Sequence, residues 1–580
     1  DGGRVEPERV SLPFQVIERV NESRATRERE KQHGMSLFDV WQGDEGETFE
    51  AGWRNKLIWG DNKLVMSSVL KQVAGKLDLI YCGAPFATGA DFSLSVAIGE
   101  ETLDKQQSAI EEVAYRDTWG AGLDSYLSMV HARLCLIRDL LAPESQLYVH
   151  LDPGVGHYVK VLVDEVLGSA AFRNELVWCY SGGGTPRNDF PRKHDVIYRY
   201  ARGDGWVFNR EFKPYKENTQ EVGIVSTYNK GKRDLAIDLE RGTPVTDWWT
   251  DINTVTGWAP EKVGFPTQKP EALLARIIET STQPGDLVAD FFVGSGTTAV
   301  AAEKLGRRWI AADLGRYAVH TTRKRLLDTE GCRPFEVLNL GRYERAFWNV
   351  ATFGDDLDGD GATSLYEYLA FILRLYGATP TSGMEHIHGR KDKAFVHIGA
   401  VDAPVTMGEV ELAVVECLRL KGAELHVLGW EWEMGLNDLV MDEAKKRGVK
   451  LVLRQIPNEA MELDATASAG MVRFFELAWL EVEPHVKKKS RELSLTLENF
   501  VIPNPELVPE DVRQAITKWS DYVDYWAVDW DYADDTFHQG WVTYRTRKDR
   551  TLEVRTDGHA YDEPGTYRVM VKVIDIFGID

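Results

Sequence analysis

Short apolar runs that alternate with helical patterns constrain the fold of this chain more than any other feature. The apolar runs lie at residues 56–59, 77–81, 146–151, 287–292 and 309–312. Alternation of this kind is typical of an α/β domain, because the crossovers between parallel strands are usually helices. We therefore predict an open, mostly parallel sheet with helices packed on it, spanning residues 51–350.

The rest of the chain predicts further segments around this core. Residues 1–50 are polar and charged, and we expect an N-terminal polar arm. Residues 362–484 again alternate strand and helix patterns, which predicts a second α/β domain. Short alternating runs and turns over 485–580 predict a β-rich C-terminal domain. Residues 87–118 are polar without a strong period, which predicts a long loop.

The charge of the chain limits how it can meet nucleic acid. It has 68 Lys and Arg against 91 Asp and Glu, a formal net charge of −23. Bulk charge therefore disfavours a protein that coats nucleic acid non-specifically. Local basic stretches between Arg187 and Arg241 and between Arg316 and Arg325 still allow a basic groove.

Membrane insertion and a disulfide framework are both disfavoured. No apolar run approaches the roughly 20 residues that a membrane helix needs. The 5 cysteines are widely spaced without a C-x-x-C pair, which also predicts no zinc site. Together these features favour a cytoplasmic protein.

A glycine-rich turn between a strand and a helix is the first candidate binding site. The turn runs from Asp290 to Thr298 and contains Gly294 and Gly296. Glycines let the backbone approach a ligand closely, and the following helix N-terminus favours an anionic group. Asp313 ends the next strand, where a carboxylate can accept ribose hydroxyls. An ordinary tight turn or a nicotinamide dinucleotide site would fit the same residues.

Other short motifs narrow this interpretation. They are Trp59-Gly60-Asp61-Asn62, Tyr81-Cys82-Gly83-Ala84-Pro85-Phe86, Pro191-Arg192-Lys193-His194-Asp195, Thr267-Gln268-Lys269-Pro270 and Asp313-Leu314-Gly315-Arg316. In this order, over roughly residues 50–345, the sequence resembles the β-class amino DNA methyltransferases, which modify adenine N6 or cytosine N4. Within that class it looks most like the modification subunits of type III-like restriction or defence systems.

The resemblance implies a Rossmann-like methyltransferase core, with an antiparallel hairpin at one sheet edge, and S-adenosylmethionine as the methyl donor. By their positions in the motifs, the residues implied to bind this cofactor are Asp61, Asn62, Thr267, Lys269, Asp290, Phe291, Gly294, Ser295, Gly296, Thr297 and Asp313. The target base would flip out of double-stranded DNA. Pro85 and Phe86 would belong to the catalytic loop, where Phe86 would stack on that base.

The family keeps its target-recognition region at the place of residues 203–258. Candidate DNA contacts there are Trp248, Trp249, Lys230, Lys232 and Arg233. A solvated loop with its aromatic residues tucked into the fold explains this composition equally well.

One departure from the family pattern concerns the catalytic loop. The family has Asp, Asn or Ser, then Pro-Pro and an aromatic residue, where this chain has Gly83-Ala84-Pro85-Phe86. The missing side chain normally accepts a hydrogen bond from the target amino group, and its loss should cost roughly 10²-fold in rate. A natural loss of activity or an introduced inactivating change explains this better than a different acceptor in an active enzyme.

The sequence therefore predicts a methyltransferase that acts on adenine N6 in DNA, with adenine preferred only because it is commoner in the family. The competing hypothesis is a non-catalytic DNA-recognition subunit that keeps the cofactor pocket and serves a helicase or nuclease partner. Family members are often homodimers. A nicotinamide-dependent dehydrogenase would leave the motifs around Thr267 and Pro85 unexplained.

Two acidic features have plain interpretations. Asp152 follows a strand and is expected to cap the next helix. Residues Asp356, Asp358, Asp360 and Glu367 match a calcium-loop spacing, but a solvated acidic linker is the favoured interpretation.

Overall fold

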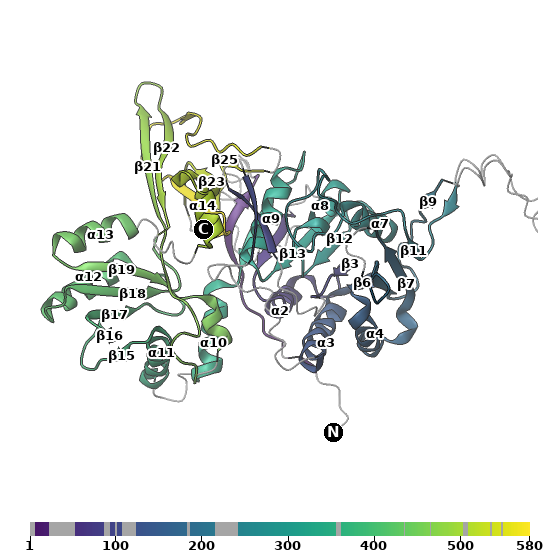
Figure 1. Cartoon of the computed structure of the whole chain (residues 1–580), viewed down its shortest axis with the longest axis horizontal. Coiled ribbons are helices and arrows are strands. Elements are labelled where there is room, and N and C mark those ends of the chain that lie inside the picture. Colours follow the sequence, from purple (N-terminus) through teal and green to yellow (C-terminus); the bar gives the residue numbers. More distant parts are fainter. Residues whose placement is uncertain are drawn as a thin grey trace, which may run out of the picture. The chain divides into compact units, whose positions relative to one another are not determined.

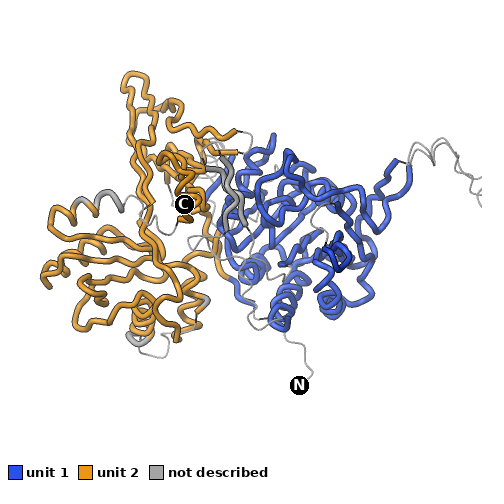
Figure 2. Tube along the Cα trace, viewed as in Figure 1, with its two compact units in different colours: residues 1–11, 18–90, 115–338 blue, residues 12–17, 91–114, 339–580 orange. Residues whose placement is uncertain are grey.

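The computed structural model describes residues 6–7, 9–21, 53–85, 93–98, 101–106, 123–181, 186–214, 242–354, 361–433, 436–463, 466–502, 508–533, 536–546 and 549–579. The chain forms two compact units (Figure 2). Unit 1 comprises residues 1–11, 18–90 and 115–338, and unit 2 comprises residues 12–17, 91–114 and 339–580.

A long twisted sheet forms the centre of unit 1, with the strand order β11-β7-β8-β6-β3-β12-β13-β2-β14-β1. Its strands are β1 (Gln15–Val20), β2 (Asn55–Trp59), β3 (Leu77–Cys82), β6 (Leu141–Leu151), β7 (Phe172–Cys179), β8 (His194–Ala201), β11 (Trp248–Trp249), β12 (Leu287–Asp290), β13 (Arg308–Asp313) and β14 (Phe335–Asn339). The central strands β6, β3, β12, β13 and β2 are all parallel to their neighbours within this group. This confirms the predicted mostly parallel sheet.

Helices cover both faces of this sheet (Figure 1). They are α2 (Asn62–Val73), α3 (Leu123–Leu140), α4 (Pro153–Leu167), α7 (Glu271–Ser281), α8 (Thr297–Lys304) and α9 (Arg316–Leu327). In Figure 1, α2, α3 and α4 lie on one side of the strands, and α7, α8 and α9 lie on the other. Strands buried from both sides become almost uniformly apolar, which is why the runs were visible in the sequence.

An antiparallel hairpin extends the sheet towards one edge, as the family resemblance implies. Strands β7 and β8 pair antiparallel, and β8 also runs antiparallel to β6. The short strands β9 (Phe212–Lys213) and β10 (Thr243–Pro244) form a separate antiparallel pair. The hairpin matters for the site, because its loop end, where Cys179 pairs with His194, lies beside the carboxyl end of β6.

Two segments differ from the expected organisation. Residues Gln15–Val20, within the expected polar arm, form strand β1 of the sheet, and the Glu18 carboxylate lies 3.3 Å from Arg323. Within the expected loop at 87–118, β4 (Ser93–Ile98) and β5 (Glu101–Gln106) pair antiparallel. Serine and alanine alternate with Leu94, Val96 and Ile98 in that sequence, a period of two that predicts a strand.

Besides the β4–β5 pair, unit 2 contains a second α/β sheet and two three-stranded antiparallel sheets. The first has the order β15-β16-β17-β18-β19-β20, with β17, β18 and β19 parallel. Its strands are β15 (Thr379–Pro380), β16 (Gly389–Lys391), β17 (Ala394–Ile398), β18 (Glu424–Gly429), β19 (Lys450–Gln455) and β20 (Phe475–Glu476), and the helices of this part are α10 (Gly341–Phe353), α11 (Gly361–Tyr376), α12 (Met407–Arg419) and α13 (Leu436–Lys446). This confirms the predicted second α/β segment.

The C-terminal residues are β-rich, as predicted. One sheet joins β21 (Trp479–Lys487), β22 (Glu492–Val501) and β26 (His559–Ala560), and another joins β25 (Trp541–Tyr544), β23 (Val523–Asp529) and β27 (Met570–Asp575). Strand β24 (Phe537–His538) and helix α14 (Glu510–Ala515) complete this part. Residues from β22 and β23, including Leu497 and Trp526, share one hydrophobic cluster. The domain boundaries at 350, 362 and 484 stay a prediction.

Two further expectations concern the membrane and the cysteines. None of the helices in the described part of the chain is long and apolar enough to cross a membrane. The five cysteines are all free thiols, and three of them are buried.

Candidate active site

The glycine-rich turn connects β12 to α8 and needs glycine for a steric reason. Gly294 and Gly296 have φ of +53° and +83°, in the left-handed region that disfavours other residues. A Cβ atom on Gly296 would lie 2.7 Å from the Thr322 Oγ1 and 2.9 Å from the Thr322 Cα. Helix α9, which carries Thr322, therefore packs directly on the turn. Only glycine fits at position 296 without displacing either the turn or helix α9.

Two buried carboxylates hold the ends of this turn. Asp290 accepts hydrogen bonds from the Phe292 amide (2.9 Å) and the Thr298 hydroxyl (2.5 Å). Burial raises the pKa of Asp290 to about 7. Asp313, at the end of β13, accepts from the backbone amides of Gly294 (2.8 Å) and Gly315 (3.0 Å). Both predicted cofactor residues are thus structural members of the turn, and each carboxylate oxygen has further lone pairs.

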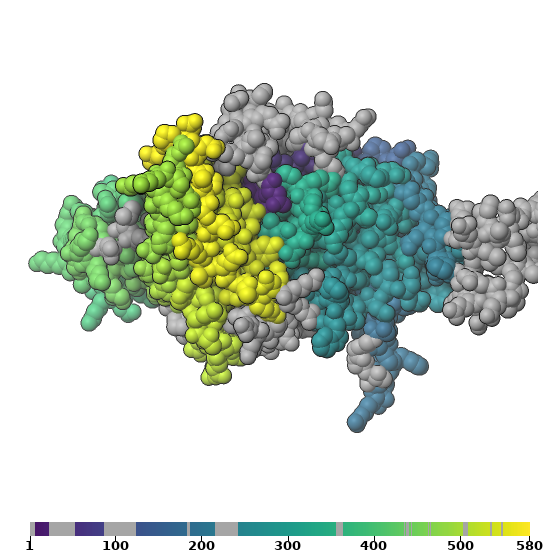
Figure 3. Space-filling model, turned by 90° about the horizontal axis from the view of Figure 1, so that it is seen from above, coloured from purple at the N-terminus to yellow at the C-terminus, as the bar shows by residue number. Residues whose placement is uncertain are grey.

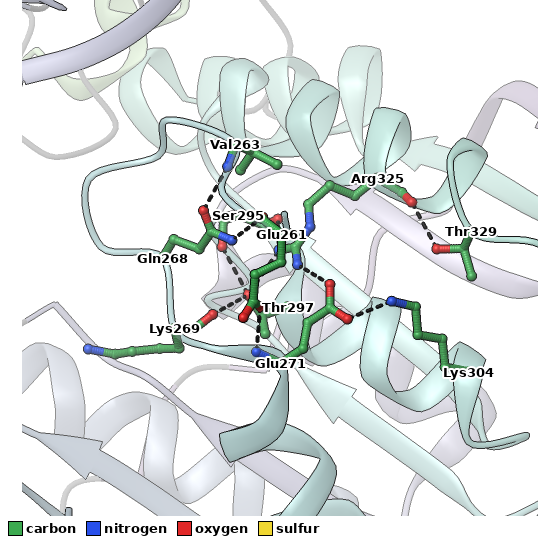
Figure 4. A network of polar contacts seen from close by, with 10 residues as sticks. All are labelled: Glu261, Val263, Gln268, Lys269, Glu271, Ser295, Thr297, Lys304, Arg325 and Thr329. Atoms are coloured by element: carbon green, nitrogen blue, oxygen red, sulfur yellow. Dashed lines mark hydrogen bonds and ion pairs between the residues drawn. The ribbon is translucent and has the colours of Figure 1, made fainter. Parts of the chain in front are cut away.

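Side-chain hydrogen bonds hold the Thr267–Pro270 segment against the glycine turn (Figure 4). The Thr297 hydroxyl donates to the Lys269 carbonyl (3.0 Å). Arg325 donates to the Ser295 carbonyl (2.8 Å), to the Thr297 hydroxyl (2.9 Å) and to the Glu271 carboxylate (2.7 Å). Two motifs that are distant in the sequence therefore form one rigid wall of the site.

No sequence motif predicted that Arg325 and Glu271 would support the site. The stretch from Arg316 to Arg325 was considered as a basic surface for DNA, but Arg323 and Arg325 are buried. Arg323 pairs with Glu18 and Arg325 with Glu271, so these arginines stabilise the fold. Residues 323 and 325 lie on different faces of helix α9, and both faces are buried, which no period in the sequence of α9 indicates.

Helix α2 begins at the same edge of the sheet. Asp61 caps its N-terminus by accepting from backbone amides of the first turn, and Arg133 pairs with the second carboxylate oxygen (3.1 Å). The buried Asn62 donates to the Phe291 carbonyl (3.2 Å) and accepts from Arg133. The structure thus brings Asp61 and Asn62 against the glycine turn. Thr267, in contrast, is exposed on the neighbouring loop.

The catalytic loop follows β3, which is the direct neighbour of β12 in the sheet. Ala84 is buried and Pro85 is half-buried, while Phe86 lies outside the described residues. A Cβ on Gly83 would lie 3.3 Å from the ring of Tyr81 and 3.7 Å from its hydroxyl. The carboxyl ends of adjacent parallel strands thus bring this loop next to the glycine turn.

A buried polar chain begins at Tyr81. Its hydroxyl lies 2.6 Å from the His150 Nδ1, and the His150 Nε2 lies 2.9 Å from the Asp195 carboxylate. Asp195 also accepts from the Tyr180 hydroxyl (2.9 Å) and the Lys269 ammonium group (3.4 Å). Three strands and two loops therefore meet in one hydrogen-bonded chain. Asp195 and Lys269 lie within short sequence motifs, whereas no motif predicts His150.

The electrostatics of this chain keep the histidine neutral. Burial, and then the charge of Lys269, lowers the pKa of His150 to about 4. Burial opposes ionisation of Asp195, but hydrogen bonding from His150 and the Lys269 charge lower its pKa to about 2. Burial also raises the pKa of Tyr81 well above its ordinary value. At neutral pH the chain is a neutral tyrosine, a neutral histidine and a carboxylate.

The predicted DNA contacts in the target-recognition region divide by exposure. Trp248 is 62% exposed, whereas Trp249 is buried, donates to the Thr246 carbonyl (2.8 Å) and packs on Arg276. Only Trp248 of this pair can therefore contact DNA without rearrangement. Lys230, Lys232 and Arg233 lie outside the described residues.

Two aromatic residues that the sequence analysis did not single out are strongly exposed. Phe190 is 90% exposed in the loop between β7 and β8, and Trp258 is 94% exposed. Arg187 and Arg192 flank Phe190 and are exposed too. Figure 3 shows this loop as a narrow blue projection. Exposed aromatic rings beside arginines are typical of single-stranded nucleic-acid contacts.

The remaining acidic candidates are Asp152 and the residues with calcium-loop spacing. Asp152 caps α4 by accepting from the Gly154 amide, which confirms the predicted cap. Asp356, Asp358 and Asp360 lie outside the described residues, and Glu367 is exposed on α11. Among the described residues, no cluster of three or more His, Cys, Asp or Glu could hold a metal ion.

Comparison with known proteins finds a family that matches part of this chain. The sequence profile of the N6/N4 methyltransferase family, described as DNA methylase, matches residues 77–324. This region is similar to the amino DNA methyltransferases. Enzymes of this family use S-adenosylmethionine as the methyl donor.

The amino DNA methyltransferase region is similar to two bacterial relatives. Type II methyltransferase M.EcaI of Enterobacter cloacae is 27% identical over 47% of this chain and 69% of its own length. Type II methyltransferase M.HpaI of Haemophilus parainfluenzae is 24% identical over 46% of this chain and 74% of its own length. Both relatives are named as type II enzymes, so the likeness to type III-like subunits stays a prediction.

Among solved structures, the complex of M1.HpyAVI with S-adenosylmethionine is 19% identical and covers 47% of this chain and 98% of its own, with a TM-score of 0.30. The second α/β segment and the β-rich C-terminus lie beyond the matched family region.

Proposed function

We propose that this chain transfers a methyl group from S-adenosylmethionine to the N6 amino group of an adenine in double-stranded DNA. One observation carries the proposal: the glycine turn, the Lys269 segment and the loop after Tyr81 lie together at the carboxyl edge of β3 and β12. Ligands of open α/β sheets bind at this edge.

The residues of the turn suit such a cofactor. Gly294 and Gly296 leave room for close backbone approach, and Asp290 and Asp313 place two buried acidic side chains at the turn. In the proposed assignment, Asp290 to Gly296 wrap the methionine part and Asp313 accepts from the ribose. Asp61 lies on the adenine side, and Thr267 and Lys269 shape the pocket. The bound cofactor supplies an electrophilic methyl group.

The protein's own contribution is to hold the target amino group and exclude water. A flipped adenine would stack on Phe86, and Pro85 would support that loop. Phe190 and Trp258, with the arginines beside Phe190, provide exposed aromatic and cationic groups for the displaced strand or the duplex backbone. The net negative charge elsewhere would confine DNA to this side of unit 1.

The test is transfer of a labelled methyl group to mixed-sequence duplex DNA, followed by digestion to nucleosides. We expect label in N6-methyladenine, and binding of S-adenosylmethionine but not of NAD in calorimetry. The control is the Asp313→Ala variant, which should lose cofactor binding. Label only in N4-methylcytosine would refute the adenine assignment, and binding of NAD alone would refute the function.

A second candidate function rests on Gly83 and Ala84, which depart from the family pattern. The chain would then recognise DNA for a helicase or nuclease partner, with bound cofactor stabilising the fold. The Gly83→Asp/Ala84→Pro double variant separates the two candidates. Methylation by that variant alone would favour the recognition subunit. Sedimentation at several protein concentrations tests the expected homodimer.

A further inference from the structure

The buried chain from Asp195 to Tyr81 ends where the side chain of residue 83 would begin. An ideal Cβ on Gly83 lies 3.7 Å from the Tyr81 hydroxyl oxygen and 3.3 Å from the Tyr81 Cε1. Residues 81 and 83 are two positions apart at the end of β3, so their side-chain positions share one side of the chain. Glycine at position 83 places no side chain of its own against that edge of the buried tyrosine ring.

We propose that the Tyr81 hydroxyl takes the place of the absent carboxylate at position 83 and accepts the hydrogen bond from the target amino group. This inference rests on the proposed function and deepens it. Tyr81 is then a catalytic residue, while His150 and Asp195 are positioning residues that act through it.

The hydrogen-bond directions in the chain follow from the chemistry of its members. The Asp195 carboxylate only accepts, so the His150 Nε2 must carry the proton that donates to it. The Nδ1 of a neutral histidine is then an acceptor, and the Tyr81 hydroxyl donates to it. The Tyr81 proton therefore points towards His150. The lone pairs of the Tyr81 oxygen are left to accept from another donor.

Packing fixes the direction of this acceptor. His150 is fully buried, and the Trp178 ring lies edge-on to it at 5.7 Å and 85°. Asp195 is held by Tyr180 at 2.9 Å and by Lys269 at 3.4 Å, which stops it from turning away. An acceptor that needs no rearrangement stabilises developing charge at the amino nitrogen more than a mobile one.

The proton balance of the step closes within the same chain. As the adenine nitrogen bonds to the methyl carbon, the carbon–sulfur bond breaks and its electron pair stays on sulfur. The nitrogen then carries a surplus proton, which passes to the Tyr81 oxygen while the Tyr81 proton passes to the His150 Nδ1. The Asp195 carboxylate stabilises the resulting imidazolium, and the proton later leaves to solvent.

The test combines Tyr81→Phe with Gly83→Asp/Ala84→Pro in a double-mutant design. In the unaltered background, Tyr81→Phe should lower the single-turnover methylation rate by about 10²-fold, because it removes only the acceptor oxygen. In the Gly83→Asp/Ala84→Pro background the same change should cost less than about threefold, because the new carboxylate accepts the bond. Cofactor affinity by calorimetry, and the fluorescence of 2-aminopurine at the target position, should stay unchanged in all four proteins.

Other outcomes overturn the inference. An equal loss of rate in both backgrounds means that Tyr81 is only structural, and no loss in the unaltered background means that another group accepts the bond. If only the Gly83→Asp/Ala84→Pro protein methylates DNA, the Tyr81 hydroxyl does not replace the carboxylate, while the scaffold remains a methyltransferase. If none of the proteins binds S-adenosylmethionine, it is the proposed function that fails.

Discussion

Replacing Gly296 by alanine should strongly destabilise unit 1, because the new Cβ atom would cause both backbone strain and a steric clash. Gly296 has φ of +83°, and an alanine in the left-handed region costs about 1–2 kcal/mol. The new Cβ would also lie 2.9 Å from the Thr322 Cα, a backbone atom of helix α9 that cannot rotate away. Overpacking of this kind costs about 1–3 kcal/mol. The expected total is about 2–5 kcal/mol in the free energy of unfolding.

Gly306 provides the matched control at the other end of helix α8. It has φ of +75°, but a Cβ there would meet no heavy atom within 4 Å. Gly306→Ala should therefore cost only the backbone strain of about 1–2 kcal/mol. The difference between the two variants isolates the contact between the turn and α9. Gly296→Ala should also weaken S-adenosylmethionine binding, whereas Gly306→Ala should leave it unchanged.

The assay is a urea titration of the full chain read by hydrogen exchange of peptides that cover β12 and α8. Such peptides report unit 1 without interference from the unfolding of unit 2. If both variants lose the same stability, the close approach of Thr322 contributes nothing and the steric reasoning is wrong. If neither loses stability, the left-handed conformations of both glycines are refuted as well.

Three further predictions address buried charge. Lys56→Met should destabilise unit 1 by about 1–3 kcal/mol in chemical denaturation, because the buried Glu336 would lose its 2.9 Å partner and keep only Arg19 at 3.4 Å and Arg54 at 3.8 Å. An unchanged stability would contradict this. Arg325→Gln should raise the Kd for S-adenosylmethionine by about tenfold in calorimetry, because it frees the Ser295 carbonyl, and an unchanged Kd would show that the turn holds itself. Burial raises the pKa of Asp290 to about 7, so the contribution of Asp290 to stability is full below about pH 4 and is lost as the pH rises through 7. Asp290→Asn should therefore gain stability relative to the unaltered chain between about pH 4 and 7.5. Parallel curves of stability against pH for the two proteins would refute the shift.

The core of the fold could be predicted because its signals are local. Strands β3, β12 and β13 are buried on both faces, so they appear as continuous apolar runs that no solvent-exposed strand would show. The segment Gln15–Val20 was missed because only alternate residues are buried and charged neighbours hide them. The β4–β5 pair was missed for a similar reason, since a weak period of two lies within a polar region.

The sequence predicted only those parts of the candidate site that lie within short motifs. The glycine turn, Asp313 and the Lys269 segment follow from short patterns whose spacing reflects close backbone approach. His150 and Arg325 carry no such pattern, since each acts through partners that are far away in the sequence. Arginines in a basic stretch look alike in sequence whether they face DNA or, as Arg323 does, a buried carboxylate.

What the sequence determined by itself is the methyltransferase core, its order of motifs and the loss of the side chain at position 83. What only the tertiary structure decided is that the Tyr81 hydroxyl, oriented by His150 and Asp195, lies beside that gap. The physical reason is that apolar periodicity and glycine turns are properties of neighbouring residues. A hydrogen-bonded chain depends on the register of β3, β6 and β8, which is settled only when the strands pack into one sheet.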